Sequence, residues 1–548
     1  MADAIQLLKL YDRAKVHRDG MVNSWDHAAR LTMPHRDAIQ EQRAATDVTP
    51  NTHRPTQLFD TTAIDANKTY AAGCMSWMTP SETTWSSYDA PPYLSDNDAV
   101  KSWYSKCTDE TRRILAGSNF YSAIHECYLD DGAFGTCGLL VEEDEKEGLR
   151  FEVLQIGSYA ILEDHRRRVN MLFRELNFTP RQAIEKFGQD AVSEATRKAA
   201  DEGSEAKNCY VHVLMPRDDA NRIAGKIDSQ NLPWASVYID TKSKEVIRES
   251  GFWENPAAVH RHLLWGTGPY GFAPAMQSLA DALQLQKMQE SMDALVEKQV
   301  TPPVLVPAGF KGKVDLRAKG YTYFKSGEEK PQFWQNPGNY MIGEDRIEFR
   351  RTQINRAFHV DLFQALAAVP VGKEMTAAEI HMRQRDRLTL FSPTFARKNT
   401  ELITPSMRHT FALLLRAGAF PEPPPGLVQQ SPEGLPFIPD PEITYTSRLA
   451  LQIRAIHNES FLRTVEMISP LAAMDPGIMD HLDMDSSTRG IARNEGMPED
   501  WLRSERDVAE MREARQREQQ RLEEEASAMN EADSIAKLAS ANVITTAA

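Results

Sequence analysis

The sequence predicts an α+β fold that is predominantly helical. Apolar residues recur with a helical period toward both ends of the chain, whereas short runs typical of strands occupy residues 138–247. The clearest element is a helix at 275–300, a stretch rich in Ala, Leu, Gln, Met and Glu that contains neither Gly nor Pro. Because the chain has 548 residues, one hydrophobic core cannot serve all of it. We expect about three or four domains.

Helices come first along the chain. The first thirty residues carry apolar positions at helical spacing among charges, with an interruption expected at Gly20. A polar loop at 40–57 follows, and further helices are expected at 59–77, 97–116 and 119–131. The helix at 59–77 ends before Thr79-Pro80, because a residue that precedes proline avoids the helical conformation.

The middle of the chain changes to a β pattern. The acidic turn Glu142–Glu147 separates two expected strands, and Val169, Met171 and Phe173 alternate as in a half-buried strand. A short helix with Thr179 as its N-cap, proline at its first position and Gly188 past its end interrupts the strands. The expected strands lie at 138–141, 149–156, 169–173, 210–214, 237–239 and 246–247, the last two paired with each other.

The second half is built around the helix at 275–300, whose apolar stripe changes sides along its length. Such a helix must meet different partners at different heights. Short strands and turns are expected at 301–343, and Thr376-Ala-Ala-Glu379 has the pattern of a capping box that opens a long helix, kinked near Pro393 and Pro405. Eight prolines between Pro421 and Pro441 predict a domain boundary. Further elements are expected as a helix at 344–366, a strand at 443–445, a helix at 448–467 and a solvated helix from 498 onward.

Composition restricts the class of protein. With 63 Lys+Arg against 78 Asp+Glu, the net charge of −15 argues against an ordinary sequence-specific DNA binder, whose domain is basic. The five cysteines form no C-x-x-C pair, so we interpret them as reduced packing residues. There is no signal-peptide pattern and no apolar run that approaches the about 20 residues of a bilayer span, so we expect a cytosolic product with no membrane partner.

No motif in the sequence makes a credible active site, and we predict no enzyme activity, cofactor or metal. The glycines of Gly132–Gly138 lie between a helix and a strand, the reverse of a phosphate-binding turn, and we interpret them as a helix C-cap. Asp483-Met-Asp485 is interpreted as a solvated turn or helix cap. His260-Arg-His262 could offer imidazoles to a metal, but no partner stands at ligand spacing nearby, so surface or core histidines are the favoured interpretation.

Arginines cluster at helical spacing in two places, at 346–356 and at 383–387. Arginine contacts phosphates through its planar donor fork, so a DNA-facing role is one reading. Ion pairing with acidic residues of adjacent helices or subunits is the alternative, and it suits so acidic a chain.

The order of these elements resembles the portal proteins, or head-to-tail connectors, of short-tailed bacteriophages. The resemblance runs from near the N-terminus to about residue 515. One departure lies between Gly271 and Pro274, where the family usually places a basic and a small residue and this chain has Phe272 and Ala273. The matching segments are Phe59-Asp-Thr-Thr-Ala, Ser118-Asn-Phe-Tyr121, Phe134-Gly135-Thr136, Tyr270-Gly271, Pro302-Pro303, Val360-Asp-Leu-Phe363 and Met375-Thr-Ala-Ala-Glu379 with Arg383.

The resemblance implies a portal fold of wing, stem, clip and crown, assembled as a ring, typically of twelve subunits, with a central channel. The ring replaces one pentamer at a capsid vertex, among major capsid and scaffolding proteins. Double-stranded DNA enters through it during packaging and leaves through it during ejection. The implied parts are the wing (1–270), stem helix 1 (271–300), the clip (301–343), stem helix 2 (344–366), the tunnel loop (367–374), a kinked helix returning to the wing (375–447) and the crown (448–548).

Candidate site residues follow from this assignment. Lys373 is the only cation of the tunnel-loop segment Val369, Pro370, Val371, Gly372 and Lys373, and we predict that it contacts DNA phosphates without reading bases; a solvent-facing lysine at a helix start is the alternative. Weaker DNA-facing candidates in the stem are Arg350, Arg351 and Lys287. The clip is expected to meet the terminase large subunit of the packaging motor and later the tail adaptor or nozzle proteins, through Phe310, Tyr321, Tyr323, Phe324, Phe333 and Trp334.

A different class of protein is also compatible with the sequence. An oligomeric cytosolic enzyme could assemble its active site from two subunits, and such a site would not be visible in one chain. Particle size separates the two hypotheses, because the portal reading requires roughly a dozen subunits around a channel.

Overall fold

The computed structural model divides into two compact units, one of residues 1–91 and 104–453 and one of residues 92–103 and 454–548. The residues that the structure describes are 3–34, 36, 58–94, 97–144, 148–218, 228–301, 303–308, 313–315, 322–323, 331–333, 340–367, 391–430, 436–472, 481–494, 497, 501–503, 507–525 and 529.

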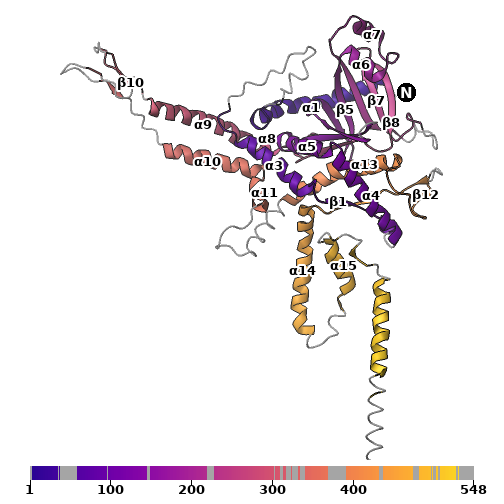
Figure 1. The fold of residues 1–548 in the computed structure, drawn as a ribbon. Helices are drawn as coiled ribbons and strands as arrows, with labels where there is room; N and C mark the ends of the chain where they lie inside the picture. Colours follow the sequence, from indigo (N-terminus) through magenta and orange to yellow (C-terminus); the bar gives the residue numbers. More distant parts are fainter. Residues whose placement is uncertain are drawn as a thin grey trace, which may run out of the picture. The chain divides into compact units, whose positions relative to one another are not determined.

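The larger unit contains a five-stranded antiparallel sheet in the order β4-β5-β6-β7-β8. Helix α1 covers one face, where Leu7 and Tyr11 pack against Val211 and Val213 (Figure 1). Helix α6 covers the other, where Ala183 packs against Tyr210. The bounds are α1 Ala4–Thr32, β4 Tyr159–Glu163, β5 Val169–Phe178, α6 Pro180–Phe187, α7 Glu194–Asp201, β6 Asn208–Pro216, β7 Trp234–Asp240 and β8 Glu245–Phe252.

Two local predictions for this sheet and its helices are confirmed, and one is wrong. Thr179 caps α6 in a capping box with Gln182, and Ile239 pairs with Val246 across the β7–β8 turn. The interruption expected at Gly20 is wrong, because α1 continues through it. A helical glycine costs about 1 kcal/mol, and tertiary contacts on both sides offset this cost: buried Arg18 lies 2.6 Å from Glu175 of β5, and buried Trp25 donates to the carbonyl oxygen of Phe134 at 3.2 Å.

A second antiparallel sheet, in the order β3-β2-β9, packs against helix α5. Helix α5 ends at Gly135, whose φ of 68° is left-handed, and β2 begins at the next residue. This confirms the C-cap expected from the glycines there. The bounds are α3 Thr62–Met78, β1 Ser86–Asp89, α4 Asp98–Gly117, α5 Phe120–Phe134, β2 Thr136–Asp144, β3 Gly148–Leu154 and β9 Ala257–Arg261.

The segment after β9 forms a two-helix arm, defined here as α9 with α10 and the β10–β11 hairpin (Figure 1). The continuous helix expected at 275–300 is divided at Ser278, and the helix expected at 344–366 begins at Tyr340 and breaks after Ala357. His359 stands at that break with a left-handed φ of 55°. The bounds are α8 Pro274–Gln277, α9 Leu279–Val300, β10 Val304–Leu305, β11 Gln332–Phe333, α10 Tyr340–Ala357 and α11 Val360–Ala367.

The chain then returns to the larger unit. Residues 391–398 are helical and lead through a π-helical segment, Asn399–Ile403, into α13 (Thr404–Arg416). The π-helical turn stands where a kink was expected, because Pro405 lacks the N–H that a regular helix needs. The capping box expected at Thr376–Glu379 lies outside the described residues.

The proline-rich stretch is not a boundary between the two units. Tyr104 donates to the carbonyl oxygen of Pro439 at 2.9 Å, and both residues belong to the larger unit, which extends to Ile453. The final strand of this stretch pairs with β1, as Tyr88 opposite Ile443 shows. The bounds are β12 Gln429–Gln430, β13 Pro436–Phe437 and β14 Glu442–Tyr445.

The smaller unit is helical. It contains a 3-10 turn at Pro92–Leu94, the first residues of α4, most of α14 (Arg448–Ala472), α15 (Met484–Asn494) and a helix at 507–525 whose residues are nearly all exposed. Arg512 binds Asp485 of α15 at 2.6 Å. Among the helices described in either unit, none has the length and apolar character required to cross a membrane.

Gly271→Ala should destabilise the larger unit. A Cβ at this position would lie 2.1 Å from the carbonyl oxygen of Gly135 and 2.8 Å from the amide nitrogen of His262, so backbone atoms must move. We expect a cost of about 1–3 kcal/mol, seen as a lower melting temperature. Gly20→Ala is the control, since a Cβ there meets nothing within 4 Å. Replacing this helical glycine should raise the free energy of unfolding by about 0.5–1 kcal/mol. Equal melting temperatures for the two variants would contradict the close approach.

Candidate functional site

The arm is fixed at its base by polar contacts with the segment that precedes α3. The side-chain oxygen of Gln286 accepts hydrogen bonds from the backbone amides of Phe59 (2.8 Å) and Asp60 (3.1 Å), and its amide donates to the carbonyl oxygen of Asp60 at 2.6 Å. Arg351 of α10 donates to the Asp60 carboxylate at 2.8 Å. The arm therefore starts from a defined point on the larger unit.

The stem arginines predicted to face DNA form ion pairs within the chain. Arg350 binds Asp281 of α9, and Arg351 binds Asp60 and lies 3.7 Å from Glu348. The pKa of Asp60 is lowered, against the effect of burial, by hydrogen bonds from Thr62 and Arg351. This geometry favours the ion-pair alternative. Lys287, by contrast, is exposed on α9.

Two of the six clip aromatics fall in the described part of the chain, and both are exposed. Tyr323 is 83% exposed, and Phe333 of the β10–β11 hairpin is 61% exposed. Phe310, Tyr321, Phe324 and Trp334 lie outside the described residues.

The predicted tunnel-loop residues, from Val369 to Lys373, lie outside the described residues as well. The helices on either side of this stretch meet each other. The rings of Phe363 in α11 and Phe391 are 5.6 Å apart and nearly perpendicular, and Phe363 also packs edge-on against Tyr70 of α3 at 6.2 Å. The chain thus leaves and returns at one aromatic cluster.

Beside this cluster lies a buried polar network centred on Asp131 of α5. The Lys398 ammonium is 2.7 Å from one carboxylate oxygen of Asp131. His260 of β9 and His262, which follows β9, approach the same carboxylate at 3.2 and 3.3 Å. Tyr70 donates to it at 2.6 Å. Three segments distant in sequence therefore converge on one carboxylate of α5.

Asp131 and Lys398 stabilise each other's charged forms. Burial alone would raise the pKa of Asp131, but Lys398 and the two histidines hold it well below its usual value. Burial alone would lower the pKa of Lys398, but the Asp131 charge keeps it above its usual value. Burial lowers the pKa of His260, which leaves its imidazole neutral at pH 7. The Asp131–Lys398 ion pair is thus the charged centre of the network.

Asp131, His260 and His262 bring three possible metal-ligand atoms within 4.8 Å of one another. The Lys398 ammonium already provides the positive charge next to this carboxylate, and a divalent cation would add uncompensated charge to a site with no solvent. The two histidines are fully or almost fully buried and therefore lie in the core. The sequence placed no ligand partner near them, but the fold brings the Asp131 carboxylate to both.

The sequence could not identify the partners of the histidines. Asp131 is separated from His262 by 131 positions, and Lys398 lies farther still along the chain. The one available signal was the i, i+2 spacing of His260 and His262, which places both on one face of a strand.

The sequence matches the family of the "Bacteriophage head to tail connecting protein" over residues 4–502. The chain belongs to this family. Among its relatives, the "Probable portal protein" of Bordetella phage BPP-1 is 29% identical over 97% of this chain and 95% of its own length. The "Portal protein" of Salmonella phage epsilon15 is 29% identical over 94% of this chain and 91% of its own length.

The connector is also similar to a chain of a solved particle structure, at lower sequence identity. A chain in the "Neck of empty GTA particle computed with C6 symmetry" is 11% identical, with 78% of this chain and 89% of that chain covered, and its TM-score of 0.35 is too low for an argument about the fold. Family membership itself gives the connector its α+β portal fold and its role in joining the head of a phage particle to the tail.

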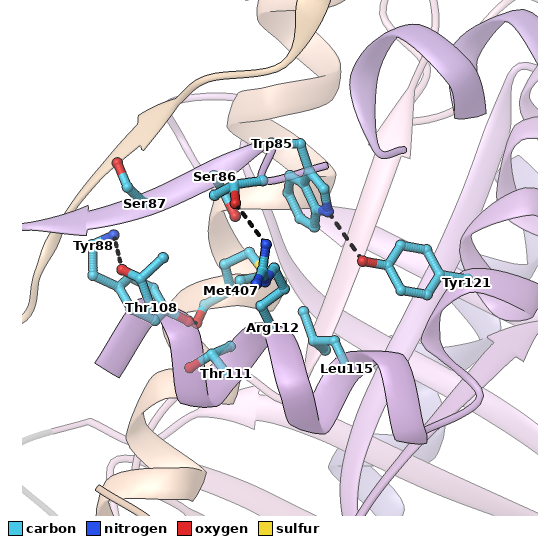
Figure 2. A pocket seen from close by; sticks show the side chains of 11 residues that line it. Trp85, Ser86, Ser87, Tyr88, Thr108, Thr111, Arg112, Leu115, Tyr121 and Met407 are labelled. Atoms are coloured by element: carbon cyan, nitrogen blue, oxygen red, sulfur yellow. Dashed lines mark hydrogen bonds between the residues drawn. The ribbon is translucent and has the colours of Figure 1, made fainter. Parts of the chain in front are cut away.

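A small pocket of the connector lies between β1 and α4 (Figure 2). Trp85 donates to the Tyr121 hydroxyl at 3.4 Å, and the Thr108 hydroxyl accepts from the Tyr88 amide at 2.9 Å, so its wall groups bind one another. Its volume of about 10 Å³ holds about one water molecule. The pocket has no room for a substrate.

Replacing Lys398 with methionine should destabilise the connector strongly, because Asp131 would be left buried without its cation. We expect a loss of about 3–5 kcal/mol, measured by thermal or urea unfolding. Adding Asp131→Asn should restore part of the loss. Lys198→Met is the control. Lys198 forms an exposed ion pair with Glu194 at 2.9 Å, and its loss should change the free energy of unfolding by less than about 1 kcal/mol. A Lys398→Met variant as stable as the wild type would show that the pair contributes nothing.

Proposed function

We propose that the chain is a portal protein that forms a ring of twelve copies at one capsid vertex. The ring is the conduit for double-stranded DNA during packaging and ejection. It is also the surface on which the terminase large subunit docks first and the tail adaptor or nozzle proteins dock later. Family membership and the names of the two phage relatives support this proposal. Synthesis takes place in the host cytoplasm, and assembly takes place on the capsid and scaffolding proteins.

The observation that carries the proposal is the distribution of apolar residues on the arm. Within α9, a helix of 22 residues, the buried residues are Ala282 and Leu285. Large apolar side chains of the arm are exposed instead, and a helix normally buries such residues against a neighbour. A second copy of the arm on either side would cover them. The exposed residues are Leu283, Val296, Val300, Met341 and Phe349.

In the proposed ring, the arms form the stem and their hairpins form the clip, with the sheets and helices of the larger unit as the wing. The exposed rings of Tyr323 and Phe333 then face the motor or the tail, since aromatic anchors commonly carry binding energy at protein interfaces. The crown corresponds to residues from 448 onward.

Two of the stem candidates for DNA contact are already paired. Arg350 and Arg351 bind acidic residues of the same chain, so of the candidates named from the sequence we keep Lys287 and the tunnel-loop Lys373 as the proposed phosphate contacts. Weak, sparse contacts suit a channel through which a polyanion must slide.

Electron microscopy of the purified protein tests the ring. We expect particles of roughly a dozen subunits around a central channel, and we expect the double variant Leu283→Asp/Phe349→Asp to remain monomeric. The control is Val16→Asp, which places the same charge on an apolar residue of α1 that is 71% exposed. A monomeric or dimeric wild-type protein would refute the proposal.

Lys373→Ala tests the DNA contact separately. Loss of this cation should change the rate of DNA packaging or ejection several-fold. The rate should also depend less on salt concentration, because one phosphate contact is removed. Lys198→Ala, on the exposed surface of α7, is the control. Normal rates of both packaging and ejection in Lys373→Ala particles would remove the assignment while leaving the ring intact.

A further inference from the structure

The turn between β4 and β5 presents a run of positive charge on this acidic chain. His165, Arg166, Arg167 and Arg168 are all exposed. Arg167 lies 3.7 Å from Glu163. In the described part of the chain, no carboxylate lies within ion-pair distance of Arg166 or Arg168.

The turn is held rigidly. One carboxylate oxygen of Asp164 accepts hydrogen bonds from the backbone amides of Arg166 and Arg168, each at 2.8 Å. Arg167 has a left-handed φ of 60°, an unfavourable conformation for a residue with a side chain. Buried Arg261 donates to the carbonyl oxygen of Arg167 at 2.9 Å and fixes the turn from below. Strained residues that the surroundings hold in place cluster at functional sites.

An aromatic pair lies beside the turn. Trp265 is 62% exposed and stacks on Phe272, with ring centroids 4.4 Å apart and an interplanar angle of 19°. Arg167 joins the two features, since it donates to the carbonyl oxygen of Gly266 at 3.2 Å. We call Arg166, Arg167, Arg168, Trp265 and Phe272 the basic-aromatic patch.

Two glutamates lie toward the opposite end of strand β2. The patch adjoins the first residue of β2, because Arg261, which donates to the carbonyl oxygen of Arg167, pairs with Thr136. Glu143 is exposed and Glu142 is half-buried opposite Arg150 of β3, and we call these two glutamates the acidic β2–β3 tip. The strand from Thr136 to Glu143 spans about 23 Å. The two surfaces therefore cannot meet within one chain, but they can meet between copies.

We propose that the basic-aromatic patch binds the acidic β2–β3 tip of a second copy of this chain. A contact between two different surfaces at opposite ends of one element is heterologous, and heterologous contacts generate rings when the rotation closes. The inference rests on the proposed ring and identifies one part of its subunit interface.

Two properties of the patch favour a protein partner over DNA. An exposed tryptophan stacked on a second ring offers a large rigid surface, and Trp and Arg are the residues that most often carry the binding energy of protein interfaces. Phosphate contacts of duplex DNA need the cations but make no use of the aromatic pair.

Charge reversal tests the contact. We expect Arg166→Glu/Arg168→Glu to raise the protein concentration needed for ring assembly at least tenfold, measured by mass photometry and electron microscopy. Glu142→Lys/Glu143→Lys should act likewise, and the chain carrying all four substitutions should assemble nearly as the wild type does. Trp265→Ala should weaken assembly without any change of charge. Arg181→Glu/Lys198→Glu is the control, since it makes the same change of net charge on the exposed surface of α6 and α7.

The outcomes separate this inference from the proposed function. If the wild type forms rings and Arg166→Glu/Arg168→Glu forms them equally well, the patch assignment is overturned and the ring stands. If both charge reversals block assembly but the fourfold variant stays monomeric, the pairing of these two surfaces is wrong. If the rings persist and only DNA retention falls, the patch binds DNA instead. A wild-type monomer would overturn both the ring and the contact.

Discussion

The Asp131–Lys398 ion pair is the interaction on which the larger unit depends. Neither side chain is exposed to solvent, so each would be strongly unfavourable alone. The pair joins α5 to the helix at 391–398, while Tyr70 adds α3 and His260 adds β9. Four segments must therefore reach their final positions together before the charges are satisfied. An apolar core would tolerate small shifts among these segments, whereas the buried ion pair requires a single arrangement of them.

That arrangement determines how the arm is presented. The Tyr70 hydroxyl contacts the carboxylate of the pair, and the Tyr70 ring packs in T-shaped contacts with Phe358 and Phe363. The break between α10 and α11 is therefore in contact with the network. The arm itself has little core of its own. A rigid base and an apolar, incompletely buried arm suit a subunit whose direction is fixed by its own fold and whose stem is completed by its neighbours.

Local chemistry explains what could be predicted from the sequence. The cap of α6 at Thr179, the C-cap at Gly135 and the β7–β8 pairing depend on neighbouring residues, and all three are confirmed. Errors arose where distant contacts outweigh propensity: α1 passes through Gly20 because Arg18 and Trp25 bind other elements. The network escaped prediction for the same reason, since no spacing relates Asp131 to Lys398.

The net charge of the chain argues against one kind of DNA contact only. A net charge of −15 per chain sums to about −180 in a ring of twelve, although salt limits the reach of each surface charge to about 10 Å. Tight, static binding of DNA is excluded by such a balance, but passage is not. Some cations have structural roles: Arg350 and Arg351 bind carboxylates at the base of the arm, and Lys398 binds one in the interior. Arg166 and Arg168 are exposed and lie on the basic-aromatic patch, for which we propose an acidic partner surface on a neighbouring copy of the chain.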